Sequence, residues 1–265
     1  MDVRAALDAF DDQLRRNATP DEPDGVVERE DGVVRMVSPS GWYAVIWSAL
    51  AADAADAAIQ RQISRFAGLD WEWKHYSYDQ PADLPDRLRA AGLTAEPAET
   101  LMLAEVAELD RVPAPPAGVH LVDVVDEAGV DQLVRLHRDV FGVDRPGLAA
   151  ALLARLGESV TPVLAVDDSG RAVAAARIEY PPGTDFAGLW GGGTLPAWRG
   201  RGIFRALVAH RAALAAARGI RWLQVDAMPT SRPILQRLGF TPAATVTAWV
   251  PAPAHPPAPR PGVGE

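Results

Sequence analysis

The sequence predicts an α/β (α+β) protein in which a mixed central sheet is flanked by helices. Hydrophobic residues make up 48% of the 265 residues, which is enough to bury a sizeable core. Apolar stretches with strand-like and helix-like spacing alternate along the chain. Near residue 200, a glycine-rich basic turn joins an extended apolar stretch to an alanine-rich helical stretch. Such an order is typical of a sheet whose strands are connected by helices.

The first part of the chain begins with a helix and a hairpin. Val3, Leu7, Phe10 and Leu14 recur at helical spacing and predict an amphipathic helix that ends near residue 17. A Glu-Asp-Gly turn separates two valine-rich stretches, which predicts a β-hairpin. The elements expected after the helix are hairpin strands at 26–29 and 33–36, an extended or turn segment at 39–47, a helix over 54–66, a strand over 71–77 and a helix over 83–91.

A proline-rich segment at 111–118 divides the chain. Its sequence, Arg-Val-Pro-Ala-Pro-Pro-Ala-Gly, predicts a linker. We therefore expect an N-terminal domain over 1–110 and a second domain over 119–250. The residues at 251–265 are rich in proline, alanine and glycine and predict a disordered tail.

The second part of the chain repeats strands and helices in a regular order. Its elements are expected to be strands at 119–125, 161–166, 172–179, 186–195, 220–225 and 244–250, with helices at 127–140, 146–156 and 203–217 and a short helix within 231–240. The predicted order is strand, two helices, three strands, helix, strand, short helix and strand.

The turn at 199–202 has the features of an anion site. Gly200 and Gly202 let the backbone approach a ligand closely, and Arg199 and Arg201 add positive charge. Amides at the start of the following helix lack intrahelical partners and lie at the positive end of the helix dipole. The chain's only lysine is Lys74, so the turn is not a P-loop, and it does not match G-x-G-x-x-G. The turn is therefore predicted to hold a phosphate or pyrophosphate in another way.

The pattern Arg199-x-x-Gly202-x-Phe204, preceded by Thr194-Leu195-Pro196, resembles the acetyl-CoA pyrophosphate loop of the GNAT (GCN5-related N-acetyltransferase) superfamily. A short helix that ends in Leu-Gly-Phe follows at the matching distance, as in that family. The family pattern is Q/R-x-x-G-x-G/A, and Phe204 replaces its final small residue, so one backbone approach is less open. The residues that the resemblance assigns to acetyl-CoA binding are Thr194, Leu195, Arg199, Gly200, Arg201, Gly202, Ile203 and Phe204.

This resemblance implies a GNAT fold and transfer of an acetyl group from acetyl-CoA to an amine in a ternary complex. Two central strands would part, and backbone groups near Thr194 and Leu195 would pair with the pantetheine amides. A general base must accept a proton from the amine, and a general acid can protonate the leaving thiolate. The family's usual acid is a tyrosine, and Leu235 stands at its position. Another group or water would then protonate the sulfur, or catalysis would be weak.

Three side chains are candidates for the chemistry. Glu179, at the end of the strand before the predicted cofactor strand, is our first choice for the base, although a glutamate at a strand end is more often simply solvated. Asp226 ends the strand after the long helix, and either takes part in catalysis or caps the following loop. Ser231 either donates a hydrogen bond to sulfur or phosphate or caps the short helix.

Other residues are expected to surround this chemistry. Tyr180 and Asp185 flank a proline- and glycine-containing turn and are expected to shape the acceptor entrance. Trp190 and Trp198 either line the acceptor and cofactor channels or, Trp190 above all, belong to the core. His137 lies on an apolar helix face and is interpreted as a packed histidine rather than a base.

The chain also shows an internal echo. Residues 84–94, followed by an apolar stretch at 100–103, resemble residues 232–241 followed by 245–250. We interpret the N-terminal half as a degenerate second half of the same fold; the alternative is that leucine-glycine-apolar endings are simply a common helix stop. The N-terminal half lacks a turn of the R-x-x-G-x-G kind, so no cofactor is expected there.

Composition excludes several function classes. The formal net charge of −9 argues against nucleic-acid binding. The chain has no cysteine and five scattered histidines, so no disulfide and no metal site is expected. A signal peptide and a membrane span are not apparent in the sequence, so we expect a cytoplasmic protein with no membrane partner. The acidic balance favours a cationic acceptor, either a small amine such as a polyamine or aminoglycoside-like amine, or a peptide or protein amine.

Two classes of function therefore fit the sequence. The first is an acetyl-CoA-dependent N-acetyltransferase. The alternative is a catalytically inert GNAT-like module that binds acyl-CoA or another protein, which Leu235 and the degenerate first half favour. A nucleotide-binding regulator that uses the same turn is a third, weaker reading. The N-terminal domain would either cover the acceptor side or form the surface of a homodimer.

Overall fold

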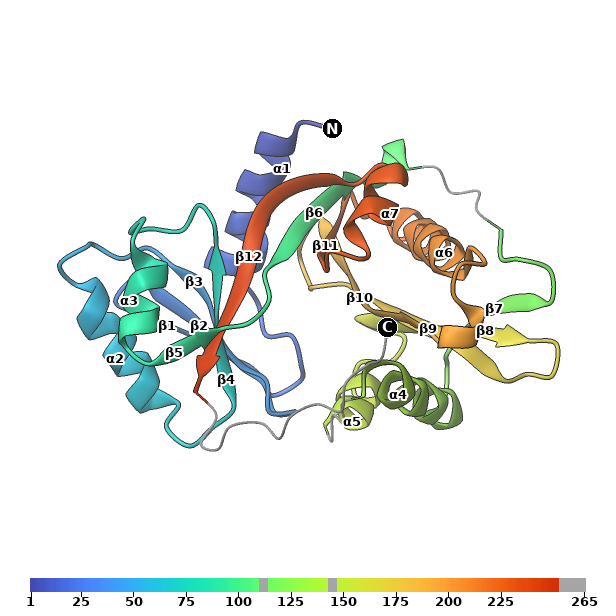
Figure 1. Ribbon diagram of the computed structural model, residues 1–265, viewed down its shortest axis with the longest axis horizontal. Helices are drawn as coiled ribbons and strands as arrows, with labels where there is room; N and C mark the ends of the chain where they lie inside the picture. Colours follow the sequence, from blue (N-terminus) through green and yellow to red (C-terminus); the bar gives the residue numbers. More distant parts are fainter. Residues whose placement is uncertain (110–113, 143–146, 253–265) are drawn as a thin grey trace.

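The computed structural model describes residues 1–109, 114–142 and 147–252 (Figure 1). The elements of the first half are α1 (Val3–Phe10), a π-helix (Asp11–Arg16), β1 (Val26–Glu30), β2 (Val33–Val37), β3 (Tyr43–Ser48), α2 (Ala55–Arg65), β4 (Trp71–Tyr76), α3 (Leu84–Ala90), β5 (Leu93–Ala95) and β6 (Glu99–Glu105). The elements of the second half are β7 (Val119–Asp123), α4 (Glu127–Phe141), α5 (Leu148–Leu153), β8 (Val160–Asp167), β9 (Ala172–Glu179), β10 (Phe186–Thr194), α6 (Ile203–Ala217), β11 (Trp222–Ala227), α7 (Arg232–Arg237) and β12 (Thr241–Pro251), and 3₁₀ turns lie at Val106–Glu108 and Pro196–Trp198.

All the strands of the described residues join one mixed sheet of twelve strands. Its order is β1-β2-β3-β4-β12-β6-β11-β10-β9-β8-β7, and β5 also pairs with β12. Figure 1 shows α2 and α3 against the part of the sheet made by the first half, and α6 and the α4–α5 pair on opposite sides of β8–β10. The predicted α/β architecture with helices around a mixed sheet is confirmed.

Each half contains one pair of parallel strands that part after three residue pairs. In the first half, residues 43–45 of β3 pair with 71–73 of β4. In the second half, residues 186–188 of β10 pair with 222–224 of β11. Since β10 continues to Thr194 and β11 to Ala227, the two strands run on without pairing to each other. The fold thus has the parted central strands that the GNAT resemblance implies, once in each half.

The two halves exchange strands at the centre of the sheet. Strand β6 belongs to the first half in sequence, but it lies between β11 and β12 of the second half and pairs antiparallel with both. Strand β12, at the end of the second half, crosses in the other direction and pairs with β4 and β5. The segments 1–110 and 119–250 therefore share one hydrogen-bonded sheet. Of the expected linker, only residues 114–118 are described, and most of the expected tail lies outside the described residues.

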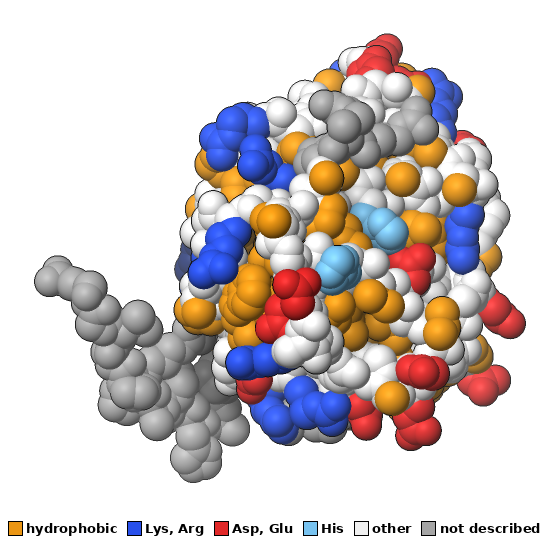
Figure 2. Space-filling model, turned by 90° about the vertical axis from the view of Figure 1, so that its right-hand side faces the viewer, with side chains coloured by type: hydrophobic (Ala, Val, Ile, Leu, Met, Phe, Trp, Pro, Cys, Tyr) orange, Lys and Arg blue, Asp and Glu red, His pale blue; other side chains and the backbone are white. Residues whose placement is uncertain are grey.

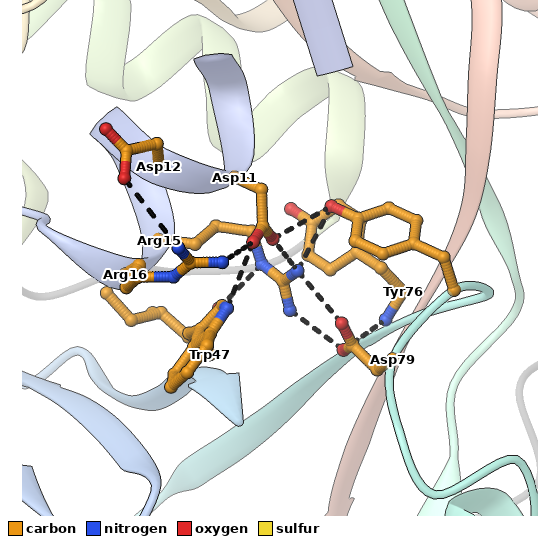
Figure 3. Close-up of polar contacts among 9 residues, drawn as sticks. Asp11, Asp12, Arg15, Arg16, Trp47, Tyr76 and Asp79 are labelled. Atoms are coloured by element: carbon orange, nitrogen blue, oxygen red, sulfur yellow. Dashed lines mark hydrogen bonds and ion pairs between the residues drawn. The ribbon is translucent and has the colours of Figure 1, made fainter. Parts of the chain in front are cut away.

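A buried ion pair lies where the parallel strands of the first half part (Figure 3). Arg15 is only 2% exposed, and its guanidinium donates to both carboxylate oxygens of Asp79 at 2.9 and 2.8 Å. Its Nε donates to the Ile46 carbonyl of β3 at 2.9 Å, while the Tyr76 amide of β4 donates to Asp79 at 2.9 Å. The guanidinium also lies 4.0 Å from the centre of the Tyr76 ring. The backbone groups that the parting of β3 and β4 exposes are thus satisfied by side chains.

Element boundaries differ from the sequence predictions at several places. The helix expected to end near residue 17 is α-helical only to Phe10 and continues as a π-helix over Asp11–Arg16. The π-helix contains the buried Arg15. The helix expected over 146–156 covers only Leu148–Leu153. The final strand is longer than expected, because Thr241–Pro251 pairs with three other strands.

The outer face of the second half mixes side chains of all kinds. Figure 2 looks onto the right-hand side of the Figure 1 view, where basic, acidic and hydrophobic side chains are interspersed. Strand β7 is the outer strand at this end of the sheet. On it, His120 lies 3.2 Å from Asp168, and Asp123 lies 2.6 Å from His210 of α6. No helix in the described part of the chain is long and apolar enough to cross a membrane.

Leu103 tests the exchange of strands, because it is fully buried on β6. The substitution Leu103→Ala is expected to lower the free energy of unfolding by about 2–5 kcal/mol through the cavity it leaves. Both halves should unfold in one shifted urea transition, measured by tryptophan fluorescence and far-UV circular dichroism, because β6 pairs with strands of the second half. The control Leu153→Ala, at a side chain that is 38% exposed, should have a much smaller effect. Two transitions, of which only one moves, would contradict the prediction.

Candidate active site

The glycine turn between β10 and α6 has backbone that only glycine adopts readily. The φ angles of Gly200 and Gly202 are 75° and 89°, and a side chain at either would be strained. A Cβ built at Gly200 meets nothing within 4 Å, so this position is open to a ligand. The first α6 amide that bonds along the helix is that of Ala206, which donates to the Gly202 carbonyl at 3.1 Å. The amides before it therefore lie at an open, positively polarised helix start.

Two exposed arginines stand on this turn. The Nε of Arg199 donates to the Thr194 carbonyl at 3.1 Å, and the Arg201 guanidinium lies 4.7 Å from the centre of the Trp198 ring. Trp198 is half-buried, and Arg201 stacks on its ring. The Leu195 amide donates to the Val173 carbonyl at 3.0 Å. Thr194 and Leu195 thus have partners within the chain, while the arginine head groups remain near solvent.

The last two residues assigned to acetyl-CoA point inward. Ile203 is buried in the core between α6 and the sheet. Phe204 is half-buried and packs against the core cluster under α6, with its ring close to Gly192 on β10. Only their backbone amides can face a ligand at the turn, so the Phe204 ring narrows the approach less than its position in the sequence suggests.

A run of glycines lets α4 pack closely on β10. A Cβ at Gly193 would lie 2.9 Å from Val140 and 3.0 Å from Phe141, both on α4. The carbonyl of Gly191 accepts a hydrogen bond from His137 Nε2 at 2.8 Å. His137 is buried, and its ring meets Phe141 edge-on. The histidine therefore holds α4 to the irregular part of β10, consistent with its interpretation as a packed residue.

Glu179 lies at the predicted place but between two arginines. Arg177 Nε is 2.5 Å from one carboxylate oxygen, and Arg155 Nη1 is 3.0 Å from the other. Burial by itself would raise the pKa of Glu179, but the two guanidinium groups outweigh it and hold the pKa below its usual value. A carboxylate with a lowered pKa and both oxygens paired is poorly suited to take a proton. Glu179, the residue that the sequence favoured as the base, is therefore held in two ion pairs in this structure.

Asp226 forms a buried ion pair with the chain's only lysine. Lys74 Nζ, from β4 of the first half, lies 2.6 Å from Asp226 Oδ2. The Asp226 side chain is 2% exposed, and its Oδ1 has no hydrogen-bond partner among the described residues. Burial by itself would lower the pKa of Lys74, but attraction to Asp226 outweighs it and raises that pKa far above its usual value. The predicted alternative for Asp226, a loop cap, is not what the structure shows.

Glu99 is a candidate that the sequence reasoning missed. It lies half-buried at the start of β6. Burial raises the pKa of Glu99 to about 7, and the negative charges of Asp226 and Glu72 act in the same direction, while Lys74 opposes them. The sequence signals that could have found this cluster are the alternation of Glu72 and Lys74 along β4 and the glutamate that opens the apolar strand β6.

The remaining candidates make contacts with other parts of the chain. The Ser231 hydroxyl donates to the Met228 carbonyl at 3.1 Å and does not cap α7, and Leu235 is buried in the core. Asp185 accepts a hydrogen bond from Gln13 at 2.9 Å, and Tyr180 is buried with its ring 3.9 Å from the Arg218 guanidinium. Asp185 is exposed and Tyr180 is buried, and their role at an acceptor entrance stays a prediction. In the described parts of the chain, no group of three or more potential metal ligands is found.

Part of the chain matches a family model, and the whole chain is similar in fold to several solved structures. The model of the Acetyltransferase (GNAT) family matches residues 130–240. A GCN5-related N-acetyltransferase from Kribbella flavida superposes with a TM-score of 0.70 at 18% identity, over 96% of this chain and 95% of that one. A tandem GNAT protein from the clavulanic acid biosynthesis pathway gives 0.60 at 17% identity, over 91% and 86%. A GCN5-related N-acetyltransferase from Sphaerobacter thermophilus gives 0.59 at 13% identity, over 84% and 81%. A search of the curated proteins finds no significant match.

The Lys74–Asp226 pair can be tested by its contribution to stability. The substitution Lys74→Met should lower the free energy of unfolding by about 3–5 kcal/mol, because it leaves the Asp226 carboxylate buried without a partner. The double variant Lys74→Met/Asp226→Leu should recover most of this loss, measured by urea unfolding. Arg135→Met is the matched control, since its ion pair with Asp131 at 3.9 Å is exposed on both sides and should contribute less than about 1 kcal/mol. Equal losses of unfolding free energy in Lys74→Met and Arg135→Met would contradict a buried Lys74–Asp226 pair.

Proposed function

We propose that this chain, whose residues 130–240 match the model of the Acetyltransferase (GNAT) family, is an N-acetyltransferase that uses acetyl-CoA as its acyl donor. The observation that carries this proposal is the open glycine turn at the start of α6, next to the point where β10 and β11 part. The turn supports anion binding, and the parted strands expose backbone groups next to it. The two features together suit a long ligand with a phosphate-bearing end.

The residues at this turn fit the phosphate-bearing part of acetyl-CoA. The amides of residues 200–204 would hold the pyrophosphate, and Arg199 and Arg201 would add charge. Positive φ at Gly200 and Gly202 makes the fit depend on glycine. When bound, acetyl-CoA would supply the acetyl group as a thioester. Its placement along β10 would bring that group toward the cluster of Asp226, Lys74 and Glu99.

In this proposal the protein contributes mainly by positioning its two substrates. Holding the amine and the donor in attack geometry supplies much of the rate. The amine must also lose a proton, which requires a base near the acceptor. With Leu235 buried in the core, the chain has no tyrosine at the family position to protonate the thiolate, so water would do so. The acceptor is proposed to be a cationic amine, as the net charge of −9 favours.

A second candidate function is an acyl-CoA-binding module without activity. It is favoured by the buried Leu235 and by the two arginines that hold Glu179. Both candidates require the turn to bind the cofactor, and they differ only in turnover.

Binding at the turn is tested by Gly202→Asp. The wild type should bind acetyl-CoA with micromolar affinity in isothermal titration, and Gly202→Asp should abolish this binding, because it adds a carboxylate to an anion site. The matched control is Gly68→Asp, since Gly68 has a similar φ of 79° and lies on the first half, away from the turn. The control should bind like the wild type, and thermal melting should show both variants folded. Unchanged affinity in Gly202→Asp would contradict the assignment of the turn to acetyl-CoA binding.

Turnover separates the enzyme from the inert module. The chain contains no cysteine, so release of the CoA thiol can be followed with a thiol reagent without a signal from the protein. With a panel of primary amines, the enzyme should release thiol faster than in the absence of an acceptor. The N-acetylated forms of the same amines serve as controls, because they have no primary amine left to react. Micromolar acetyl-CoA binding without amine-dependent release across the panel would favour the inert module.

A further inference from the structure

A polar cluster from both halves lies on the sheet face opposite α6. Asp226 is the register partner of Leu101 on β6, and Glu99 lies two residues before Leu101 on the same face. Glu99 is the partner of Val246 on β12, and Lys74 is the partner of Ala248, again on this face. The side chains that the sheet brings together here are Glu72 and Lys74 from β4, Glu99 from β6, Trp190 from β10, and Asp226 from β11.

This cluster borders the point at which β10 and β11 part. The last pair between the two strands is Gly188 with Gln224. Trp190 and Asp226 each lie two residues beyond that pair, on the two sides of the opening. Lys74 Nζ connects them, since it is 2.6 Å from Asp226 and 5.5 Å from the centre of the Trp190 ring. The cluster therefore faces the opening that our proposed function assigns to the acetyl-bearing end of the donor.

One oxygen in this cluster lacks a partner. Asp226 Oδ1 is buried and accepts no hydrogen bond from any described residue, although its twin Oδ2 is held by Lys74. A buried carboxylate oxygen without a donor is costly, so such atoms in native proteins usually have a partner. A ligand with an N–H group would satisfy it. The Lys74 contact at Oδ2 holds the carboxylate in place.

The charges around the cluster select the kind of ligand. Three carboxylates, those of Glu72, Glu99 and Asp226, face one ammonium group, and that ammonium is already paired. An amine carries positive charge into this surplus of acid, whereas a second carboxylate on the ligand would be repelled. The Trp190 ring offers an apolar and cation-attracting wall beside it. The cluster thus suits a cationic alkylamine without a nearby acidic group.

We propose that the acceptor site is shared by the two halves, that Asp226 Oδ1 accepts a hydrogen bond from a cationic alkylamine, and that Glu99 takes the proton which this amine loses. The inference rests on the proposed function. In the reaction the amine nitrogen forms a bond to the acetyl carbon while the carbon–sulfur bond breaks. Glu99 takes one proton from the ammonium group before attack, and the nitrogen releases a second proton to water as the amide forms. The electron pair of the carbon–sulfur bond leaves with the sulfur, which takes up one proton from water, so the protons balance. Lys74 is a positioning residue that holds Asp226.

The titration of Glu99 agrees with this role. Burial, Asp226 and Glu72 raise its pKa to about 7, and Lys74 opposes them. A base works best when its pKa lies near the working pH, because it is then both available and basic enough. Since the base must be deprotonated, kcat/KM should rise as the pH increases through about 7 and level off above it. The charged groups that act on Glu99 are Asp226, Lys74 and Glu72, and the Glu72 carboxylate accepts a hydrogen bond from Trp42 Nε1 at 2.9 Å.

The test compares binding and turnover in the full chain. The probes are butane-1,4-diamine and 4-aminobutanoate, which have the same length but differ in the charge of the second end. The protein saturated with acetyl-CoA should acetylate the diamine at least ten times faster in kcat/KM, and the CoA-loaded protein should bind only the diamine in isothermal titration. Binding of neither amine, or equal use of both, would overturn the acceptor class. Failure of the wild type to bind acetyl-CoA at all would instead overturn the proposed function.

The variant Glu99→Gln isolates the base. It should bind the diamine within about threefold of the wild type, lose about 100-fold or more in kcat, and lose the rise of kcat/KM near pH 7. Glu99→Asp should restore part of the activity and the pH dependence. Glu96→Gln is the matched control, three residues earlier and exposed, and should behave like the wild type. A Glu99→Gln protein that melts normally and keeps both its rate and its pH profile would exclude Glu99 as the base.

Discussion

Strands β6 and β12 each cross from one half of the chain into the other, and this exchange builds the centre of the sheet. An unpaired strand edge leaves backbone N–H and C=O groups without partners, and each half on its own would present such an edge at the centre of the molecule. Placing β6 between β11 and β12, and β12 against β4, closes both edges at once. The same pairings set Glu99 near Asp226 and bring Lys74 to it. Residues 152 positions apart in sequence meet because two strands change places.

The two halves contain the same parting of parallel strands, but they use it differently. In the first half, the guanidinium of Arg15 and the carboxylate of Asp79 satisfy the backbone of β3 and β4 there, so a ligand would have to displace a buried ion pair. In the second half, the corresponding stretch of β10 contains Gly191–Gly193, against which side chains of α4 and α6 pack closely. The open turn with positive φ at Gly200 and Gly202 follows only this stretch. Both partings thus carry a buried ion pair, and the second half differs by the open glycine turn that follows its parting.

The individual strands, helices and the glycine turn could be predicted from the sequence because they follow from local patterns. The contacts between distant strands could not, because they depend on which strands pair and in which register. The strand at 172–179 and the helix at 203–217 follow from apolar spacing, and the glycine turn from residue types that few other structures require. The exchange of β6 and β12 depends on which strands are neighbours, and no local spacing encodes that. For the same reason, Glu179 looked free in the sequence, although Arg155 comes back to it from the loop after α5. Lys74 and Glu99 were overlooked because their partners lie in the other half.

The environments of the two glutamates also bear on whether the chain is an enzyme. Glu179 is held as a carboxylate by two arginines, whereas Glu99 lies beside other carboxylates and can gain a proton near neutral pH. Loss of the family tyrosine at Leu235 removes an acid, but a thiolate is a weak base, with a pKa of about 8.5 for a simple thiol, and it can leave into water without one. An ammonium acceptor has a much higher pKa and cannot attack until a base removes its proton. The leucine at position 235 therefore argues less against activity than the environment of Glu99, the base that we propose, argues for it.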